Sequence, residues 1–221
     1  MIAVMRSVAA AALCFGVLAG CGSGSGGEVK ADIGRISAIK ASFGPQFSIT
    51  EVAPTGIDPR VLAGQKLPDG TTFDPAGCAQ FATGQLIPAG TEGNMAAVSA
   101  EGEGNRFVVI AVQTSEAVPV VEPGPDCRTV GFAGGAARGT VEVVEVPAIT
   151  DAKTIGVHRV VQTVVNGKPA TGEVYNYSAH FGDYQVIVSA NPLVAPDEPV
   201  VPVNTQRARD LLIAGVNAIR S

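Results

Sequence analysis

The chain has 221 residues and a formal net charge of −5, with 46% hydrophobic but only 16% charged residues. This composition excludes a disordered chain, and the excess of acidic over basic residues argues against a nucleic-acid partner. Because Trp is absent and aromatic residues make up only 5%, a hydrophobic core has to be built mainly from Val, Ile, Leu and Ala.

The N-terminal 20 residues have the layout of a secretory signal peptide. Arg6 is followed by an apolar run from Val8 to Leu18 and then by small residues. The run is too short to span a bilayer. We therefore expect residues 1–20 to be a signal peptide and the rest of the protein to lie outside the cytoplasm.

The end of this segment, Leu18-Ala19-Gly20-Cys21, resembles the lipobox of bacterial lipoproteins. The resemblance implies cleavage before Cys21 and acylation of the new N-terminal Cys21, which would anchor the protein to the outer face of the cytoplasmic membrane. Residues 21–28, rich in Gly and Ser, would then form a lipidated flexible tether. The alternative is an ordinary cleaved signal followed by a Cys that carries no lipid.

Cys78 and Cys127 are the two cysteines that remain when the signal peptide and Cys21 are set aside. In an oxidising compartment such a pair is expected to form a disulfide. The alternative is a redox or metal-binding pair, but the two residues are not in a CxxC spacing and no His lies nearby in the sequence. We therefore expect a disulfide and no metal site.

Residues 29–221 are expected to form a single domain that begins with a helix. Isoleucines recur at helical spacing over Ala31–Phe43, and Phe47–Val52 alternates as a short strand. Residues 53–75 are rich in Pro and Gly and predict a surface loop. Asp74-Pro75 then has the pattern of a helix N-cap followed by Pro, which predicts a short helix that carries Cys78.

The middle of the chain predicts a hairpin and two further elements. Met95–Ala100 and Arg106–Thr114 flank a Gly-rich turn, and the second of these strands is apolar on both faces, so we expect it near the centre of the sheet. Asp126–Phe132 is expected to form a short helix that holds Cys127. Thr140–Val146 is expected to be a strand.

The last third gives the clearest pattern, because Asn166-Gly167 is a strong signal for a two-residue hairpin turn between Ile155–Val165 and Gly172–Phe181. A second turn at Gly182-Asp183 leads to the strand Tyr184–Ala190. The register of these turns assigns one face to the core: Tyr175, Tyr177, Ala179, Phe181, Tyr184, Val186 and Val188. It assigns the other face, which we expect to be exposed to solvent, to Asn176, Ser178, His180, Gln185 and Ser189.

The C-terminal segment has an unbroken apolar stripe at helical spacing and predicts a helix capped by Asn204 or Thr205. The stripe consists of Ala208, Leu211, Leu212, Gly215, Val216 and Ile219. The expected fold is therefore α+β: an antiparallel sheet of about six strands with N- and C-terminal helices packed on one face.

Candidate functional residues are few. The strand count places His158 beside Tyr175 on the core face and His180 on the opposite face, so the two histidines cannot share a metal or a catalytic triad. His158, Tyr175 and Tyr177 are the candidates for a ligand groove, because Tyr combines an apolar body with a polar tip. The alternative for these tyrosines is core packing. We expect no cofactor and no catalytic residue.

The lipobox, the single long-range Cys pair, the run Tyr175-x-Tyr177-Ser178-Ala179 and the closing helix resemble cell-envelope lipoproteins of unknown function from mycobacteria and related actinobacteria. More loosely, the chain is similar to the extracellular sensor domain of PknH-type mycobacterial kinases. The resemblance implies a sheet with helices, a disulfide and a sensor-like role.

Together these patterns predict a membrane-anchored extracytoplasmic lipoprotein that is not an enzyme and that binds a ligand or partner as a sensor-like or accessory domain. The membrane would be reached through the lipid anchor. An envelope protein, a lipid or a small molecule would be the further partner. The alternative is a lipid or glycolipid carrier of the cell envelope, which would need a large apolar cavity between the sheet and the helices.

Overall fold

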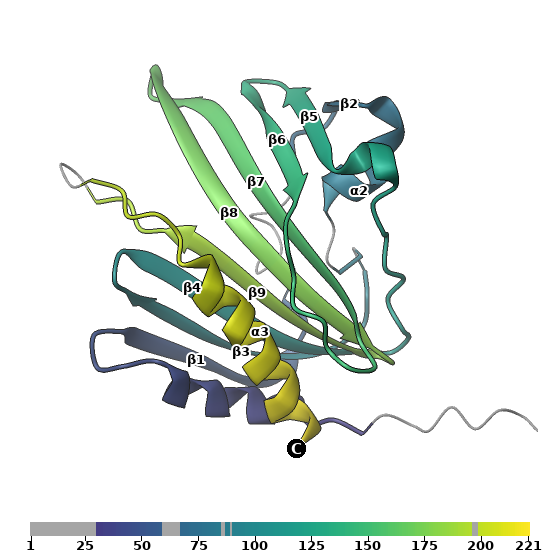
Figure 1. Cartoon of the computed structure of the whole chain (residues 1–221), viewed down its shortest axis with the longest axis vertical. Helices are drawn as coiled ribbons and strands as arrows, with labels where there is room; N and C mark the ends of the chain where they lie inside the picture. Colours follow the sequence, from purple (N-terminus) through teal and green to yellow (C-terminus); the bar gives the residue numbers. More distant parts are fainter. Residues whose placement is uncertain (1–29, 59–66, 85–86, 89, 196–198) are drawn as a thin grey trace, which may run out of the picture.

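The structure, a computed structural model, describes residues 30–58, 67–84, 87–88, 90–195 and 199–221. These residues form a nine-stranded antiparallel sheet with helices packed against it (Figure 1). The predicted α+β class is confirmed, but the expectation of about six strands is wrong. The predicted signal peptide (1–20), the tether (21–28) and Cys21 lie outside the described residues, as does part of the predicted loop 53–75.

The strands are, in chain order, β1 (Ser48–Gly56), β2 (Thr72–Asp74), β3 (Gly93–Gly102), β4 (Asn105–Thr114), β5 (Thr129–Gly134), β6 (Ala137–Val143), β7 (Lys153–Val165), β8 (Lys168–Phe181) and β9 (Tyr184–Pro192). Their order across the sheet is β1-β3-β4-β9-β8-β7-β6-β5-β2. The predicted hairpin of β3 and β4 is confirmed, and β4 is a central strand because it pairs with both β3 and β9.

The two C-terminal hairpins have the predicted register. Val165 pairs with Lys168 across the first turn, and Phe181 pairs with Tyr184 across the second. Asn166 and Gly167 have φ values of 51° and 75°, the left-handed conformation that a tight hairpin turn of this type requires. The turn chemistry therefore fixes which side chains of β7, β8 and β9 share a face.

The predicted helix Asp126–Phe132 is wrong. Only Pro125–Cys127 (η3) is helical, as a single 3₁₀ turn, and β5 follows. Val130 and Phe132 alternate with Gly131, so both are buried on one face of the sheet against β6. This period of two explains the additional strand. The strand predicted at Thr140–Val146 exists, but it begins at Ala137 and ends at Val143.

The N-terminal helix forms where it was expected, but it is a 3₁₀ helix (η1, Ile33–Ser42). Its buried isoleucines lie three residues apart, at positions 33, 36 and 39. A spacing of three puts them on one line when a helix has three residues per turn, whereas they would drift around an α-helix. The Asp32 side chain accepts a hydrogen bond from the Gly34 backbone N–H at 2.9 Å and caps the helix.

The C-terminal helix α3 (Thr205–Arg220) crosses one face of the sheet, which we call the helix face (Figure 1). Asn204 caps it by accepting a hydrogen bond from the Arg207 N–H at 3.0 Å. As predicted, its apolar stripe packs on the strands together with η1. The main buried cluster includes Leu211, Leu212, Val216 and Ile219 from α3 and Tyr177, Ala179, Phe181, Val186 and Val188 from the sheet.

The opposite face of the sheet is covered by η2 (Ala76–Cys78), by α2 (Ala79–Thr83) and by residues 115–124, which we call the strap. The disulfide between Cys78 and Cys127 joins the helical segment to the chain that follows the strap, as predicted. The expected N-cap at Asp74 is wrong. Asp74 ends β2, and the cap position is occupied by Pro75 without a side-chain hydrogen bond.

Candidate ligand-binding site

Five polar side chains of β8 and β9 lie together on the strap face of the sheet, and we call them the polar cluster: Asn176, Ser178, His180, Gln185 and Ser189. They share a face because residues two apart on a strand point the same way, and because Asn176 pairs with Ser189 and His180 with Gln185 across the hairpin. This is the set that the hairpin register grouped from the sequence.

The polar cluster is held together by hydrogen bonds between its members. The Ser189 hydroxyl donates to Oδ1 of Asn176 at 2.6 Å. On the other side, Nε2 of His180 lies 3.1 Å from Oγ of Ser178 and 3.3 Å from Nε2 of Gln185. The cluster is therefore an ordered network, not a set of independent surface side chains.

The expectation that this face is exposed to solvent is wrong. Asn176, Ser178 and Gln185 are 5%, 1% and 2% exposed, and His180 is partly buried. The cover comes from the strap and from α2, which approach the sheet from distant parts of the sequence. An amphipathic strand with one polar face usually leaves that face in water, so the alternation alone gave no sign of the cover.

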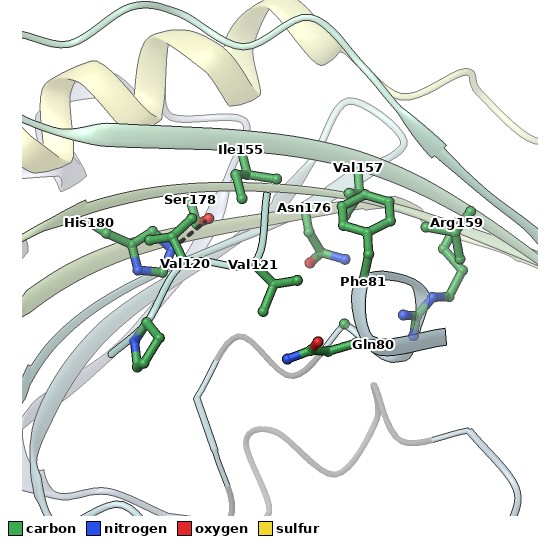
Figure 2. A pocket seen from close by; sticks show the side chains of 13 residues that line it. Gln80, Phe81, Val120, Val121, Ile155, Val157, Arg159, Asn176, Ser178 and His180 are labelled. Atoms are coloured by element: carbon green, nitrogen blue, oxygen red, sulfur yellow. Dashed lines mark hydrogen bonds between the residues drawn. The ribbon is translucent and has the colours of Figure 1, made fainter. Parts of the chain in front are cut away.

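Between this cover and the sheet lies a pocket of about 80 Å³ (Figure 2). Its lining comprises Gln80, Phe81 and Gly84 from the α2 segment, Pro119, Val120 and Val121 from the strap, and Val141, Ile155, Val157, Arg159, Asn176, Ser178 and His180 from β6, β7 and β8. Figure 2 shows Asn176, Ser178 and His180 on the sheet side, with Val121 and Phe81 facing them. The pocket thus has mostly apolar walls and a polar floor.

The His180 imidazole is electrically neutral at physiological pH. Burial disfavours the charged form and lowers the pKa of His180 to about 4. The Gln185 amide nitrogen and the Ser178 hydroxyl both lie beside Nε2 of His180, and each can donate to it. We assign Nε2 as the acceptor and therefore place the proton of the neutral ring on Nδ1.

Arg159 closes one end of the pocket and fixes α2 to the sheet. Its Nη2 donates to the backbone carbonyls of Ala82 and Thr83, at 3.0 and 3.4 Å, which are orphan acceptors at a helix C-terminus. Burial lowers the pKa of Arg159. Gly84 follows α2 with a φ of 61°, the left-handed conformation that favours glycine, and a Cβ there would lie 2.5 Å from Nη2 of Arg159, so the guanidinium would have to shift.

Comparison with protein families gives a match over residues 32–220 to a family described as a domain of unknown function, DUF5642. The chain belongs to this family. The family match agrees with the predicted resemblance to proteins of unknown function, while lipid attachment stays a prediction.

Among solved structures, the DUF5642 chain is similar to an uncharacterised protein, the Rv0999 ortholog, from Mycobacterium smegmatis. The identity is 58%, the TM-score is 0.81, and the match covers 87% of this chain and 98% of the other. The extracellular domain of PknH from Mycobacterium tuberculosis matches at 12% identity with a TM-score of 0.37, over 86% and 93% of the two chains. That likeness is too low to transfer a fold or a function. The comparison with curated proteins gives no match.

The predicted groove residues of the DUF5642 chain are on the other side of the sheet, the helix face. His158 pairs with Tyr175, and the two rings are stacked with centroids 4.0 Å apart. Nε2 of His158 lies 2.9 Å from Oε2 of Glu173. Tyr177, by contrast, is buried beneath α3. The structure therefore brings His158 and Tyr175 together and places Tyr177 in the core.

Tyr175 lies in a partly desolvated, acidic environment. Burial raises the pKa of Tyr175, and the nearby carboxylates of Glu173 and Glu142 raise it further. The predicted separation of the two histidines is confirmed, since His158 and His180 are on opposite faces of the sheet. They cannot act on one substrate atom.

An open groove of about 490 Å³ lies at the β2 edge of the sheet. Its lining includes the small residues Gly131 and Ala133 and the cross-strand pair Arg138 and Gln162, whose Nε and Oε1 atoms lie 3.1 Å apart. The sequence gave no signal for this groove, because it forms where small residues of β5 and β6, Gly131, Ala133 and Gly139, come together across neighbouring strands.

Within the described ranges, no three His, Cys, Asp or Glu side chains are grouped so that they could hold a metal ion. No helix in this part of the chain is long and apolar enough to cross a membrane. The matches described above name no catalytic activity.

Proposed function

We propose that this DUF5642 chain is an extracytoplasmic lipoprotein, anchored to the outer face of the cytoplasmic membrane through Cys21, that binds a small ligand and catalyses no reaction on it. The ligand would lie in the pocket between the polar cluster and the strap. An envelope protein that senses the bound state would be a further partner. The pocket supports the site, the N-terminal pattern that ends at Cys21 supports both the anchor and the compartment, and the disulfide adds support for the compartment.

The observation that carries the proposed binding function is the composition of the pocket. Three successive inward positions of β8 are polar, Asn176, Ser178 and His180, although they face Phe81 and Val121. Removing polar side chains from water costs free energy, and apolar residues at these positions would give a better packed interface. Mostly apolar walls with a few convergent polar groups are typical of ligand sites.

The extracytoplasmic location is supported by two independent features. The first is the signal peptide and lipobox pattern that ends at Cys21. The second is the disulfide between Cys78 and Cys127, because such bonds persist in oxidising compartments and are rare in the cytosol. The predicted Gly- and Ser-rich tether, residues 21–28, would let the domain stand off the membrane surface.

The alternative function, a lipid or glycolipid carrier, is less well supported. A carrier needs a large apolar cavity, yet the pocket holds about 80 Å³, well below the roughly 300–1,000 Å³ of typical ligand sites. The groove at the β2 edge is larger, but it is open to solvent and therefore does not enclose an acyl chain. The pocket therefore favours a small group over a whole lipid.

The binding function can be tested by native mass spectrometry on protein purified under mild conditions from a mycobacterial envelope. We expect a small-molecule adduct on the wild type. The adduct should be lost from Val121→Trp, which places a large ring in the pocket. Val194→Trp is the matched control, since Val194 is 74% exposed and does not line the pocket. Equal adducts on all three proteins, or none on any, would contradict the proposal.

A further inference from the structure

The pocket is small enough to limit what it can hold. A cavity of about 150 Å³ accommodates benzene, with six non-hydrogen atoms, so a pocket of about 80 Å³ has room for about three or four. A ligand larger than this would place one terminal group in the pocket and leave the rest outside. The group that enters is therefore about the size of an acetyl group.

The polar floor of the pocket offers mainly hydrogen-bond donors. In the assigned tautomer, Nδ1 of His180 carries the ring proton, and the described residues make no hydrogen bond to this nitrogen. The Oδ1 atom of Asn176 accepts from Ser189, while its amide nitrogen is a second donor on the same floor. The Ser178 hydroxyl proton is directed to His180. A ligand group that accepts hydrogen bonds fits this floor best.

The charges around the pocket select against ionised groups. No Asp or Glu is among the described residues that line it, so these residues offer no carboxylate to an ammonium group. The one cation among them, Arg159, donates to the carbonyls of Ala82 and Thr83 at the end of α2. His180 adds no positive charge at neutral pH because of its lowered pKa. An uncharged acceptor is the group that this environment stabilises.

We infer that the pocket binds the carbonyl of a short acyl group, an acetyl-type amide or ester on a larger molecule, with His180 Nδ1–H donating to the carbonyl oxygen. The methyl end would contact Val120, Val121 and Ile155. This assignment rests on the proposed binding function and specifies its ligand class. An N-acetyl amide and an O-acyl ester present the same carbonyl and methyl group, so both are expected to bind.

The probes for the test are N-methylacetamide and methyl acetate, which separate the amide from the ester source. Isobutene is the apolar control of similar shape, and acetate and methylammonium are the charged controls. Binding is followed by NMR of the purified protein with ¹⁵N-labelled histidine. We expect both carbonyl probes to shift the NMR signal of the proton-bearing Nδ1 of His180. A shift with only the amide, or with only the ester, would show which of the two groups the natural ligand carries. Isobutene and the two ions should leave the signal in place.

The variant His180→Leu separates the hydrogen bond from the shape of the pocket. The affinity of this variant for the carbonyl probes should be about three- to tenfold lower than that of the wild type, which corresponds to the loss of one hydrogen bond. Its affinity for isobutene should be no lower than that of the wild type. Unchanged backbone spectra away from the pocket would show that the variant is folded. Val121→Trp should abolish binding of the two carbonyl probes and of isobutene. The control variant Ile213→Ala, on the exposed side of α3, should behave as the wild type.

Three results would overturn the inference. They are a proton on Nε2 instead of Nδ1 in the histidine spectrum, acetate binding more tightly than the amide and the ester, or equal binding of isobutene and the carbonyl probes. If any of these occurs while native mass spectrometry still finds an adduct that Val121→Trp removes, the proposed binding function stands and the ligand class is wrong. If the adduct is also missing, the binding function fails as well.

Discussion

Oγ of Ser178 and Nε2 of His180 lie 3.1 Å apart on the face of β8 that the strap covers. Burial keeps the imidazole neutral, and in the assigned tautomer Nε2 accepts a hydrogen bond from the Ser178 hydroxyl. Nε2 of Gln185 approaches the same ring nitrogen from β9 at 3.3 Å. Protonation of the buried His180 ring would cost free energy. The protonation state of this pocket residue therefore affects the stability of the fold.

We predict that His180 makes the protein less stable as the pH falls from about 6.5 to about 4. Its pKa is 6.5 in an unfolded chain and about 4 in the fold, so within this window the unfolded state binds more protons. The stabilisation that comes from burying a neutral His180 is fully present above pH 6.5 and is lost by about pH 4. A shift of this size corresponds to about 3 kcal/mol in the free energy of unfolding.

The measurement is urea denaturation of the wild type and of His180→Gln at several pH values. Other groups, such as Asp and Glu, titrate in both proteins, so the difference between the two curves isolates His180. The wild type should lose more stability than His180→Gln on acidification. Parallel curves would show that the ring is not buried as a neutral group.

A second prediction concerns the packing of α3 on the sheet. Leu212 is 0% exposed within the main core, whereas its neighbour Ile213 is 39% exposed on the outer side of the helix. Leu212→Ala should lower the free energy of unfolding by about 2–5 kcal/mol, because it leaves a cavity. Ile213→Ala should change it by about 0.5 kcal/mol or less. Similar losses from both substitutions would mean that α3 presents a different face to the sheet.

The third prediction is that the disulfide stabilises the whole fold and, in particular, α2 and the strap, which cover the pocket. Cys78 and Cys127 are 49 residues apart, and closing a loop of this length contributes about 4 kcal/mol in the chain-entropy model. The double variant Cys78→Ser/Cys127→Ser should therefore unfold at lower denaturant concentration. Amide hydrogen exchange should speed up in α2 and the strap more than in α3. Uniform acceleration would argue against a local role for the bond.

The fourth prediction tests the anchor. Replacing Cys21 with Ala should move the protein from the membrane fraction of cells to the soluble fraction, because acylation of this residue is what the lipobox resemblance implies. Ser23→Ala, within the same tether, is the matched control and should leave the protein in the membrane fraction. Retention of Cys21→Ala in the membrane fraction would refute lipid anchoring at this residue.

The sequence alone determined those features that depend on local geometry. Asn166-Gly167 and Gly182-Asp183 specify two-residue turns, and each turn sets the register of its hairpin. The hairpin register assigned Tyr177, Ala179 and Val186 to the core face of the sheet. The helical spacing of Leu211, Leu212 and Val216 predicted that α3 covers this face. Both predictions are correct because the direction of a side chain on a strand or helix depends only on its position within that element.

The tertiary structure decided what lies on the second face of the sheet. The predicted solvent-exposed set, Asn176, Ser178, His180, Gln185 and Ser189, has the alternation of a strand with one polar side, and that pattern is the same whether water or protein covers it. The cover comes from α2 and the strap, which are far from β8 in the chain and are joined through the Cys78–Cys127 disulfide. Burial of a polar face depends on such long-range contacts, so local periodicity gives no sign of it.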